Sequence, residues 1–136
     1  MKKNGSILTN FNDVGRLIKG RMQEALPLSY GQCEVLRFVS EQGSPTMRDI
    51  AAHFRVAAPS ATSFINELVR HGHIKRVTDP RDRRIVCVAL TKKGVAQLRT
   101  IEDRRAKVLE NVLSSLSKRD REELNRILAT IIITNA

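Results

Sequence analysis

Residues 46–94, TMRDIAAHFRVAAPSATSFINELVRHGHIKRVTDPRDRRIVCVALTKKG, carry the strongest structural signal in this chain, because the period of their apolar residues changes midway. The first part predicts two short helices, Met47–Phe54 and Pro59–Arg70, separated by a tight break at residues 55–57. Thr46 is placed to cap the first of these helices, and Pro59 suits the first turn of the second. Two short helices joined in this way are typical of a helix-turn-helix.

The second part of the stretch has the alternation of β-strands. Residues 74–78 alternate between the two faces, and residues 85–90, IVCVAL, are mostly β-branched or apolar. The polar segment DPRDRR, residues 79–84, connects them. We therefore expect a β-hairpin directly after the helix pair, which makes the unit a winged helix-turn-helix.

Helical patterns flank this unit on both sides. We predict helices over residues 6–26, from Ser29 to Gly43, over about 92–115 and from Ser117 to about 134. The resulting fold is mostly α with a small antiparallel β wing. We assign residues 1–28 and 92–136 to a dimerisation region and residues 29–91 to the winged helix-turn-helix. The middle section is too small to cover the apolar stripes of the terminal helices, so we expect a homodimer held by these helices.

Composition favours a soluble protein with a polyanionic partner. The 136 residues include 24 Lys and Arg against 14 Asp and Glu, a formal charge of +10. Nucleic acid is the first candidate partner and an anionic membrane the second. Aromatic residues make up only 4%, which disfavours proteins that stack single-stranded bases. The chain contains no apolar run of membrane-spanning length and no continuous apolar stretch near its start, so we expect a cytoplasmic protein without membrane contact.

The positive charge is concentrated around the predicted hairpin. Residues 70–93 contain eight Lys or Arg and two Asp, and so carry +6 of the total. Arg side chains on an extended wing fit a narrow, electronegative minor groove of DNA. Asp82 is expected to pair with a neighbouring Arg and to orient it. The alternative, a charged turn that protects an edge strand from aggregation, does not explain the excess of one sign.

The outward face of the second short helix is rich in small polar residues. These could bond to base edges or phosphates in the major groove, although a solvated helix face has the same composition. We expect base contacts from Ser60, Thr62, Ser63 and Asn66. We expect phosphate contacts mainly from Arg48, Arg70, Arg81 and Arg83.

Motifs along nearly the whole chain resemble those of the MarR family of bacterial transcription regulators. They are Ser29…Gln32…Val35-Leu36, Ile50-Ala51, Leu68…Gly72…Ile74…Arg76, residues 79–84 and Leu90-Thr91…Gly94. The resemblance is most specific over residues 68–94. It implies a homodimeric repressor of pseudo-palindromic DNA that often responds to a small phenolic or lipophilic anion. The family's D-x-R pair matches Asp82 and Arg84, which implies that Arg84 enters the minor groove.

One departure from the family concerns the start of the second short helix. The family usually has Ser after the Val, whereas Ala57 and Ala58 follow Val56 here. Loss of such a cap costs about 1 kcal/mol. Ser60 is the candidate to replace it.

Other chemistry is not favoured by the sequence. We interpret Cys33 and Cys87 as inert buried thiols, since a disulfide is uncommon in the cytoplasm. The three histidines, His53, His71 and His73, lack further ligands at zinc-site spacing, and His71 is placed to face a helix C-terminus.

We expect neither an enzyme nor a cofactor, since no phosphate loop, nucleophile elbow or catalytic carboxylate pair occurs. Arg16, Arg21 and His53 are conceivable partners for an anionic effector. Two other functions remain open: a non-specific nucleic-acid-coating protein, and a basic protein–protein adaptor.

Overall fold

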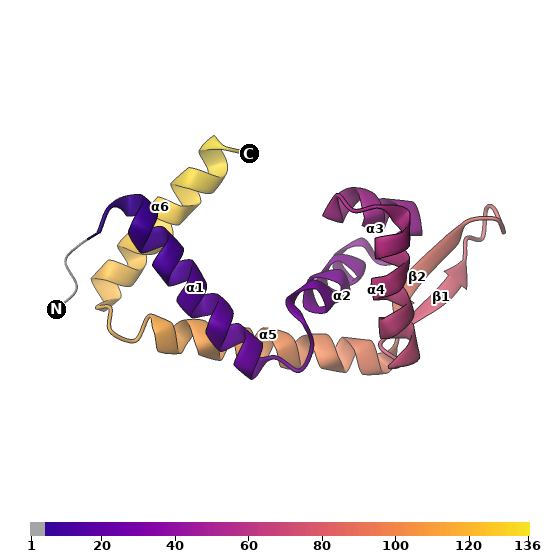
Figure 1. Cartoon of the computed structure of the whole chain (residues 1–136), viewed down its shortest axis with the longest axis horizontal. Helices are drawn as coiled ribbons and strands as arrows, with labels where there is room; N and C mark the ends of the chain where they lie inside the picture. The colour runs from indigo at the N-terminus through magenta and orange to yellow at the C-terminus, as the bar shows by residue number, and fades with distance from the viewer. Residues whose placement is uncertain (1–4) are drawn as a thin grey trace. The chain divides into compact units, whose positions relative to one another are not determined.

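The computed structural model describes residues 5–136, which form helices and one small sheet (Figure 1). The elements in chain order are α1 (Ile7–Ala25), α2 (Tyr30–Gln42), α3 (Met47–Phe54), α4 (Ala58–Arg70), β1 (Ile74–Thr78), β2 (Val86–Leu90), α5 (Lys92–Val112) and α6 (Lys118–Thr134). The predicted fold, mostly helical with a small antiparallel wing, is confirmed, and the predicted elements are all present. In the part of the chain described, no helix is both long and apolar enough to cross a membrane.

Local capping signals set most of the helix starts. The Ser29 side chain accepts the backbone N–H of Gln32, whose own side chain accepts the N–H of Ser29, so that a capping box opens α2 at the predicted start. Thr46 and Asp49 form the same reciprocal pair at α3. At α6 the Ser117 side chain acts as the cap by accepting the backbone N–H of Asp120. These caps satisfy donors that the first helical turn leaves unpaired.

The start of α4 lacks such a cap. The N-cap residue is Ala57, no side chain caps this helix start, and Pro59 lies in the first turn. The helix begins at Ala58, one residue earlier than predicted. Ser60 does not replace the missing cap, and its backbone N–H instead bonds to the Ala57 carbonyl at 3.0 Å. The expected loss of a cap is therefore confirmed.

The chain divides into two compact units. One unit is Leu26–Arg104, and the other combines the residues up to Ala25 with Arg105–Ala136, so the division falls within α5. In the first unit α2, α3, α4, the sheet and the start of α5 enclose one apolar core. Its fully buried side chains include Leu36, Val39, Ile50, Ile65, Leu68, Val88 and Ile101.

The wing is fixed to the helices by backbone contacts. The antiparallel register pairs Ile74 with Leu90 and Thr78 with Val86. Beyond the sheet, the Val88 N–H donates to the Pro45 carbonyl at 3.0 Å. The backbones of Cys87 and Thr46 also form an isolated antiparallel β-bridge. These contacts join β2 to the residues that precede α3, so the wing has a defined position relative to the helix-turn-helix.

The junction between the wing and α5 requires glycine. Thr91 Oγ1 donates to the Gly72 carbonyl at 2.5 Å and accepts the Gly94 N–H at 3.0 Å. A Cβ on Gly94 would lie 1.9 Å from the backbone oxygen of His73, a separation that no real Cβ shows. The close approach of two backbones therefore excludes any side chain at position 94 unless the backbone shifts.

Candidate nucleic-acid interface

The outward face of α4 is polar because its opposite face supplies the core. Ala61, Ile65 and Leu68 are buried. The predicted contact residues are all exposed: Ser60, Thr62, Ser63, Asn66 and Arg70. The helical period thus places small hydrogen-bonding side chains together on a surface accessible to another macromolecule.

An open depression lies on this face, lined by Ser63, Asn66, Glu67 and Arg70. Arg70 donates to the Glu67 carboxylate at 3.4 Å, one turn away on the same helix. Glu67 was not among the residues predicted to contact DNA. Its carboxylate lines the same depression as Ser63, Asn66 and Arg70, where it offers a hydrogen-bond acceptor.

A second contact missed from the sequence joins α4 to the wing. The guanidinium of Arg76, an exposed residue of β1, donates to Oδ1 of Asn66. The two residues are ten positions apart and lie on different elements. The strand and helix patterns predict that each is exposed, but not that the two are in contact. The bond links a residue of the contact face to the first strand of the hairpin.

The wing tip holds the predicted pair of Asp82 and Arg84. Arg84 Nε and Nη2 donate to the two carboxylate oxygens of Asp82, each at 3.1 Å, and the Arg84 backbone N–H adds a bond of 3.0 Å. These hydrogen bonds from Arg84 lower the pKa of Asp82. The Arg84 side chain is nevertheless 91% exposed. A charged group that is held at its base and open at its outer face is oriented for contact with a partner.

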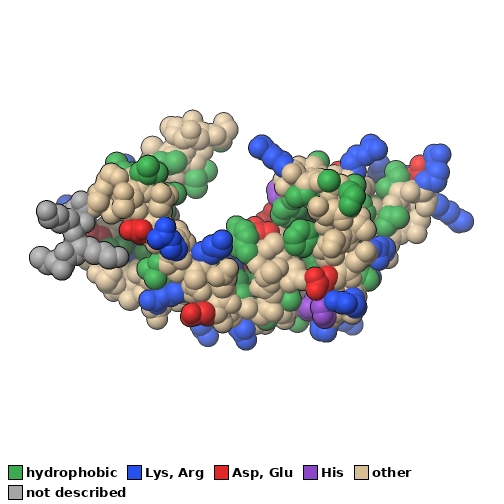
Figure 2. All heavy atoms as spheres, in the orientation of Figure 1, with side chains coloured by type: hydrophobic (Ala, Val, Ile, Leu, Met, Phe, Trp, Pro, Cys, Tyr) green, Lys and Arg blue, Asp and Glu red, His purple; other side chains and the backbone are tan. Residues whose placement is uncertain are grey.

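The remaining predicted cations are also exposed. On the hairpin, Arg81 precedes the pair and Arg83 lies between its two members, and Arg48 lies in α3. Figure 2 shows Lys and Arg side chains gathered at the end of the hairpin. The ten predicted site residues therefore lie on three parts of one compact unit: α3, α4 and the wing.

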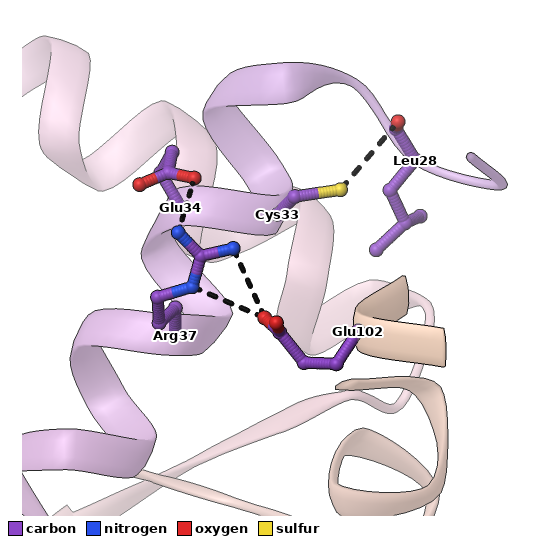
Figure 3. A network of polar contacts seen from close by, with 5 residues as sticks. All are labelled: Leu28, Cys33, Glu34, Arg37 and Glu102. Carbon is purple, nitrogen blue, oxygen red and sulfur yellow. Dashed lines mark hydrogen bonds and ion pairs between the residues drawn. The ribbon is translucent and has the colours of Figure 1, made fainter. Parts of the chain in front are cut away.

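An ion-pair network fixes α2 against α5 within this unit (Figure 3). Arg37 donates to Glu34 at 3.0 Å and, through Nε and Nη2, to Glu102 at 3.1 and 3.0 Å. Cys33 lies beside it, with its thiol directed to the Leu28 carbonyl at 3.7 Å. The network is a structural link between helices and lies on elements other than those of the contact face.

Both cysteines are buried, as the sequence predicted. Burial raises the pKa of the Cys33 thiol, and the neighbouring Glu34 raises it further. Burial also raises the pKa of Cys87, with a contribution from the charge of Asp79. Both environments disfavour the thiolate, which is the reactive form.

The three histidines have separate surroundings. His71 caps the end of α4, where its Nδ1 lies 2.9 Å from the Glu67 carbonyl, so the predicted position at a helix C-terminus is confirmed. His53 stacks on Phe38 with ring centroids 4.0 Å apart. His73 is buried, and burial, followed by the charge of Lys93, lowers its pKa. Across residues 5–136 no three potential metal-binding side chains gather in one place.

The conceivable effector-binding arginines of α1 have partners on their own unit. Arg16 lies 3.7 Å from Asp13, and Arg21 donates to Asn111 at 3.0 Å.

Comparison with known proteins agrees with this architecture. Residues 28–86 match the model of the MarR family. The HTH-type transcriptional regulator YwhA of Bacillus subtilis is 24% identical over 97 residues, which are 71% of this chain and 70% of YwhA. The crystal structure of a mutant MarR from E. coli superposes with a TM-score of 0.84 at 18% identity, over 96% of this chain and 99% of that one.

A mutant of S. aureus MepR bound to oligodeoxyribonucleotide superposes with a TM-score of 0.73 at 18% identity, over 98% of this chain and all of that one. The matched segment contains α2 and β1 together with α3, α4 and the wing tip, and these last three carry the candidate interface. Residues 28–86 thus match the MarR-family model in sequence, and the chain shares the fold of solved MarR structures.

Proposed function

We propose that this protein is a sequence-specific, double-stranded DNA-binding regulator that acts as a homodimer on a pseudo-palindromic operator. One observation carries the proposal. The exposed, small-residue face of α4 and an Arg84 oriented by Asp82 lie on the same compact unit. A helix face and a basic wing on one rigid unit can contact a major groove and the adjoining minor groove together.

The face of α4 is suited to base contacts. Ser60, Thr62 and Ser63 are short, so they let the helix backbone approach the groove closely, and Asn66 adds an amide. Arg48, Arg70, Arg81 and Arg83 would contact phosphates and fix the orientation of the helix. The similarity in fold to the MepR mutant, whose structure is that of a complex with an oligodeoxyribonucleotide, supports this assignment.

Arg84 would enter the minor groove, where the negative potential is strongest when the groove is narrow. Asp82 keeps its guanidinium in one orientation through two hydrogen bonds. The pairing also compensates the negative charge of Asp82 close to the phosphates. In this role Asp82 positions Arg84 and makes no contact of its own with a base.

The dimer would be formed by the terminal helices, so that residues 1–28 and 92–136 serve dimerisation and residues 29–91 bind DNA. Helices α1 and α6 bury none of their residues within this chain. Large apolar side chains are exposed on both: Ile7, Leu8, Phe11, Val14, Leu17, Ile127, Leu128, Ile131, Ile132 and Ile133. A second copy of the chain would remove this surface from water, and two-fold symmetry would match a palindromic site.

Repression and a response to a small phenolic or lipophilic anion complete the proposal, on the strength of the family resemblance. Operator half-sites lie about one helical turn, ~34 Å, apart. An effector that changes the distance between the two α4 helices by a few ångströms would therefore weaken binding.

Selection from a random duplex library at about 150 mM salt tests the proposal directly. We expect enrichment of an inverted repeat with half-sites about ten base pairs apart. Binding without enrichment that disappears as salt rises would indicate a non-specific coating protein. Absence of binding to any duplex would favour a protein–protein adaptor.

Two wing variants then separate base contact from phosphate contact on the selected operator. Arg84→Ala is expected to weaken specific binding by about 1–3 kcal/mol. Arg83→Ala, which removes the same charge one residue away, should lower the salt dependence with little change in base preference. Unchanged operator affinity in folded Arg84→Ala would contradict the wing assignment.

A further inference from the structure

The bond between Arg76 and Asn66 has a consequence for which base α4 prefers. Arg76 lies on β1 and donates from Nη2 to Oδ1 of Asn66, across the junction between the wing and α4. A guanidinium has donors only, so the Asn66 amide must present its oxygen to Arg76. The orientation of the amide is thereby set by its partner, and the oxygen is drawn toward the strand.

The outer part of the Asn66 side chain is then a pair of N–H donors beside a positive charge. An Asn that recognises adenine needs its oxygen for the N6 amino group and its nitrogen for N7. Here the oxygen is engaged with Arg76, and the guanidinium charge disfavours the approach of any base amino group. Guanine presents two acceptors in the major groove, N7 and O6, and therefore fits the exposed donors best.

We propose that Arg76 is a specificity-determining positioning residue: it holds Asn66 as a donor-only group that selects guanine over adenine at one position of each half-site. The inference rests on the proposed function, in which α4 contacts bases in the major groove. Arg76 acts through Asn66 and makes no base contact itself.

The experiment is selection from a random duplex library with the full-length protein and four variants. Asn66→Ala identifies the base position concerned, because the wild-type preference for guanine is lost there. Arg76→Met keeps an unbranched apolar side chain similar to the aliphatic part of arginine and removes the donors, which frees the Asn66 oxygen. We expect the preference at that position to shift toward adenine by about fivefold, while the other positions are unchanged.

Lys75→Met is the matched control. Lys75 is the preceding residue of β1, is exposed, and loses the same charge, but its side chain points to the other face of the strand. We expect weaker binding to all sequences and an unchanged base profile. Asn66→Asp is a second test of the same inference. One carboxylate oxygen would pair with Arg76 and the other would face outward as an acceptor. The preference should therefore move to cytosine, whose N4 is a donor.

Three results would overturn the inference. One is adenine as the wild-type base at the position that Asn66→Ala affects. Another is a base profile of folded Arg76→Met that is identical to that of the wild type, and a third is a Lys75→Met profile that changes in the same way as that of Arg76→Met. In each case the inverted repeat is still enriched and the proposed function stands, whereas a wild type that enriches no repeat overturns both. Far-UV circular dichroism confirms that each variant is folded.

Discussion

The two units of this chain differ in how far they bury their apolar residues. Leu26–Arg104 buries a continuous core in which Leu36, Ile65 and Leu68 are fully enclosed. The helices α1 and α6 of the other unit bury no residue, and Ile132 is 69% exposed. The first unit therefore buries its own core within one chain, while the second leaves apolar surface exposed that the proposed dimer would cover. Three experiments test this difference between the units.

The largest expected effect comes from adding one methyl group to a glycine in each unit. Gly94→Ala places a Cβ against the His73 backbone oxygen and should destabilise the protein by about 1–3 kcal/mol. Gly20→Ala, in α1, meets nothing within 4 Å and should stabilise by about 0.5–1 kcal/mol, because alanine favours helix. Urea unfolding of both variants measures the difference.

The sign of each change tests the contrast. A neutral Gly94→Ala would mean that the junction between the wing and α5 is looser than the structure shows. A strongly destabilising Gly20→Ala would mean that this part of α1 is tightly packed in the assembled protein.

An intermediate effect is expected for Ile132→Glu in α6. The side chain is exposed within one chain, so the fold of the monomer should persist, whereas a carboxylate buried in a dimer interface is unfavourable. We expect the dimer dissociation constant to rise at least about tenfold, or ~1.4 kcal/mol, as measured by sedimentation equilibrium.

Thr130→Glu is the control for this variant. It adds the same charge to the same helix, on the side that faces away from Leu128 and Ile132. Equal dissociation of both variants would show that charge alone weakens the dimer. An unaffected dimer in Ile132→Glu would place the interface elsewhere.

The smallest expected effect concerns the pH dependence of the Leu26–Arg104 unit. Burial, with Lys93 and His71 nearby, lowers the pKa of His73 in the folded state. Below about pH 6.5 the unfolded chain takes up a proton that the folded chain refuses, so stability falls as the pH falls. The slope from this one group is at most about 1.4 kcal/mol per pH unit.

His73→Leu should remove that part of the slope between pH 7.5 and pH 5.5, as measured by urea unfolding at each pH. It also removes a buried ring nitrogen, Nδ1, that has no hydrogen-bond partner within the described residues. His71→Leu, at an exposed position, removes only the smallest of the influences on the His73 pKa and should change the slope less than His73→Leu does. A His73→Leu slope equal to that of the wild type would assign the pH dependence to other groups.

The successes of sequence reasoning are mostly local. The helix start at Ser29 and the cap at Thr46 were predicted, because capping depends on residues three positions apart. The pairing of Asp82 with a nearby Arg was predicted for the same reason. The start of α4 was placed one residue late, since Pro59 fits more than one position of a first turn.

The contacts that modify the α4 face were not predicted. The bond from Arg76 to Asn66 joins residues on different elements, and no spacing rule connects them. Glu67 lies within the contact surface only because the core takes Ala61, Ile65 and Leu68, which rotates the intervening acidic residue outward.

Local patterns in the chain are thus sufficient for its helices, its hairpin, its caps and its basic wing, because each depends on neighbours within a few residues. Tertiary packing determines the contacts between these elements. The hydrogen-bonding role available to Asn66 depends on where β1 lies against α4, and the need for glycine at position 94 depends on the His73 backbone. Both follow from distances between segments that come together only when the core of Leu26–Arg104 closes, which no pattern along the sequence specifies.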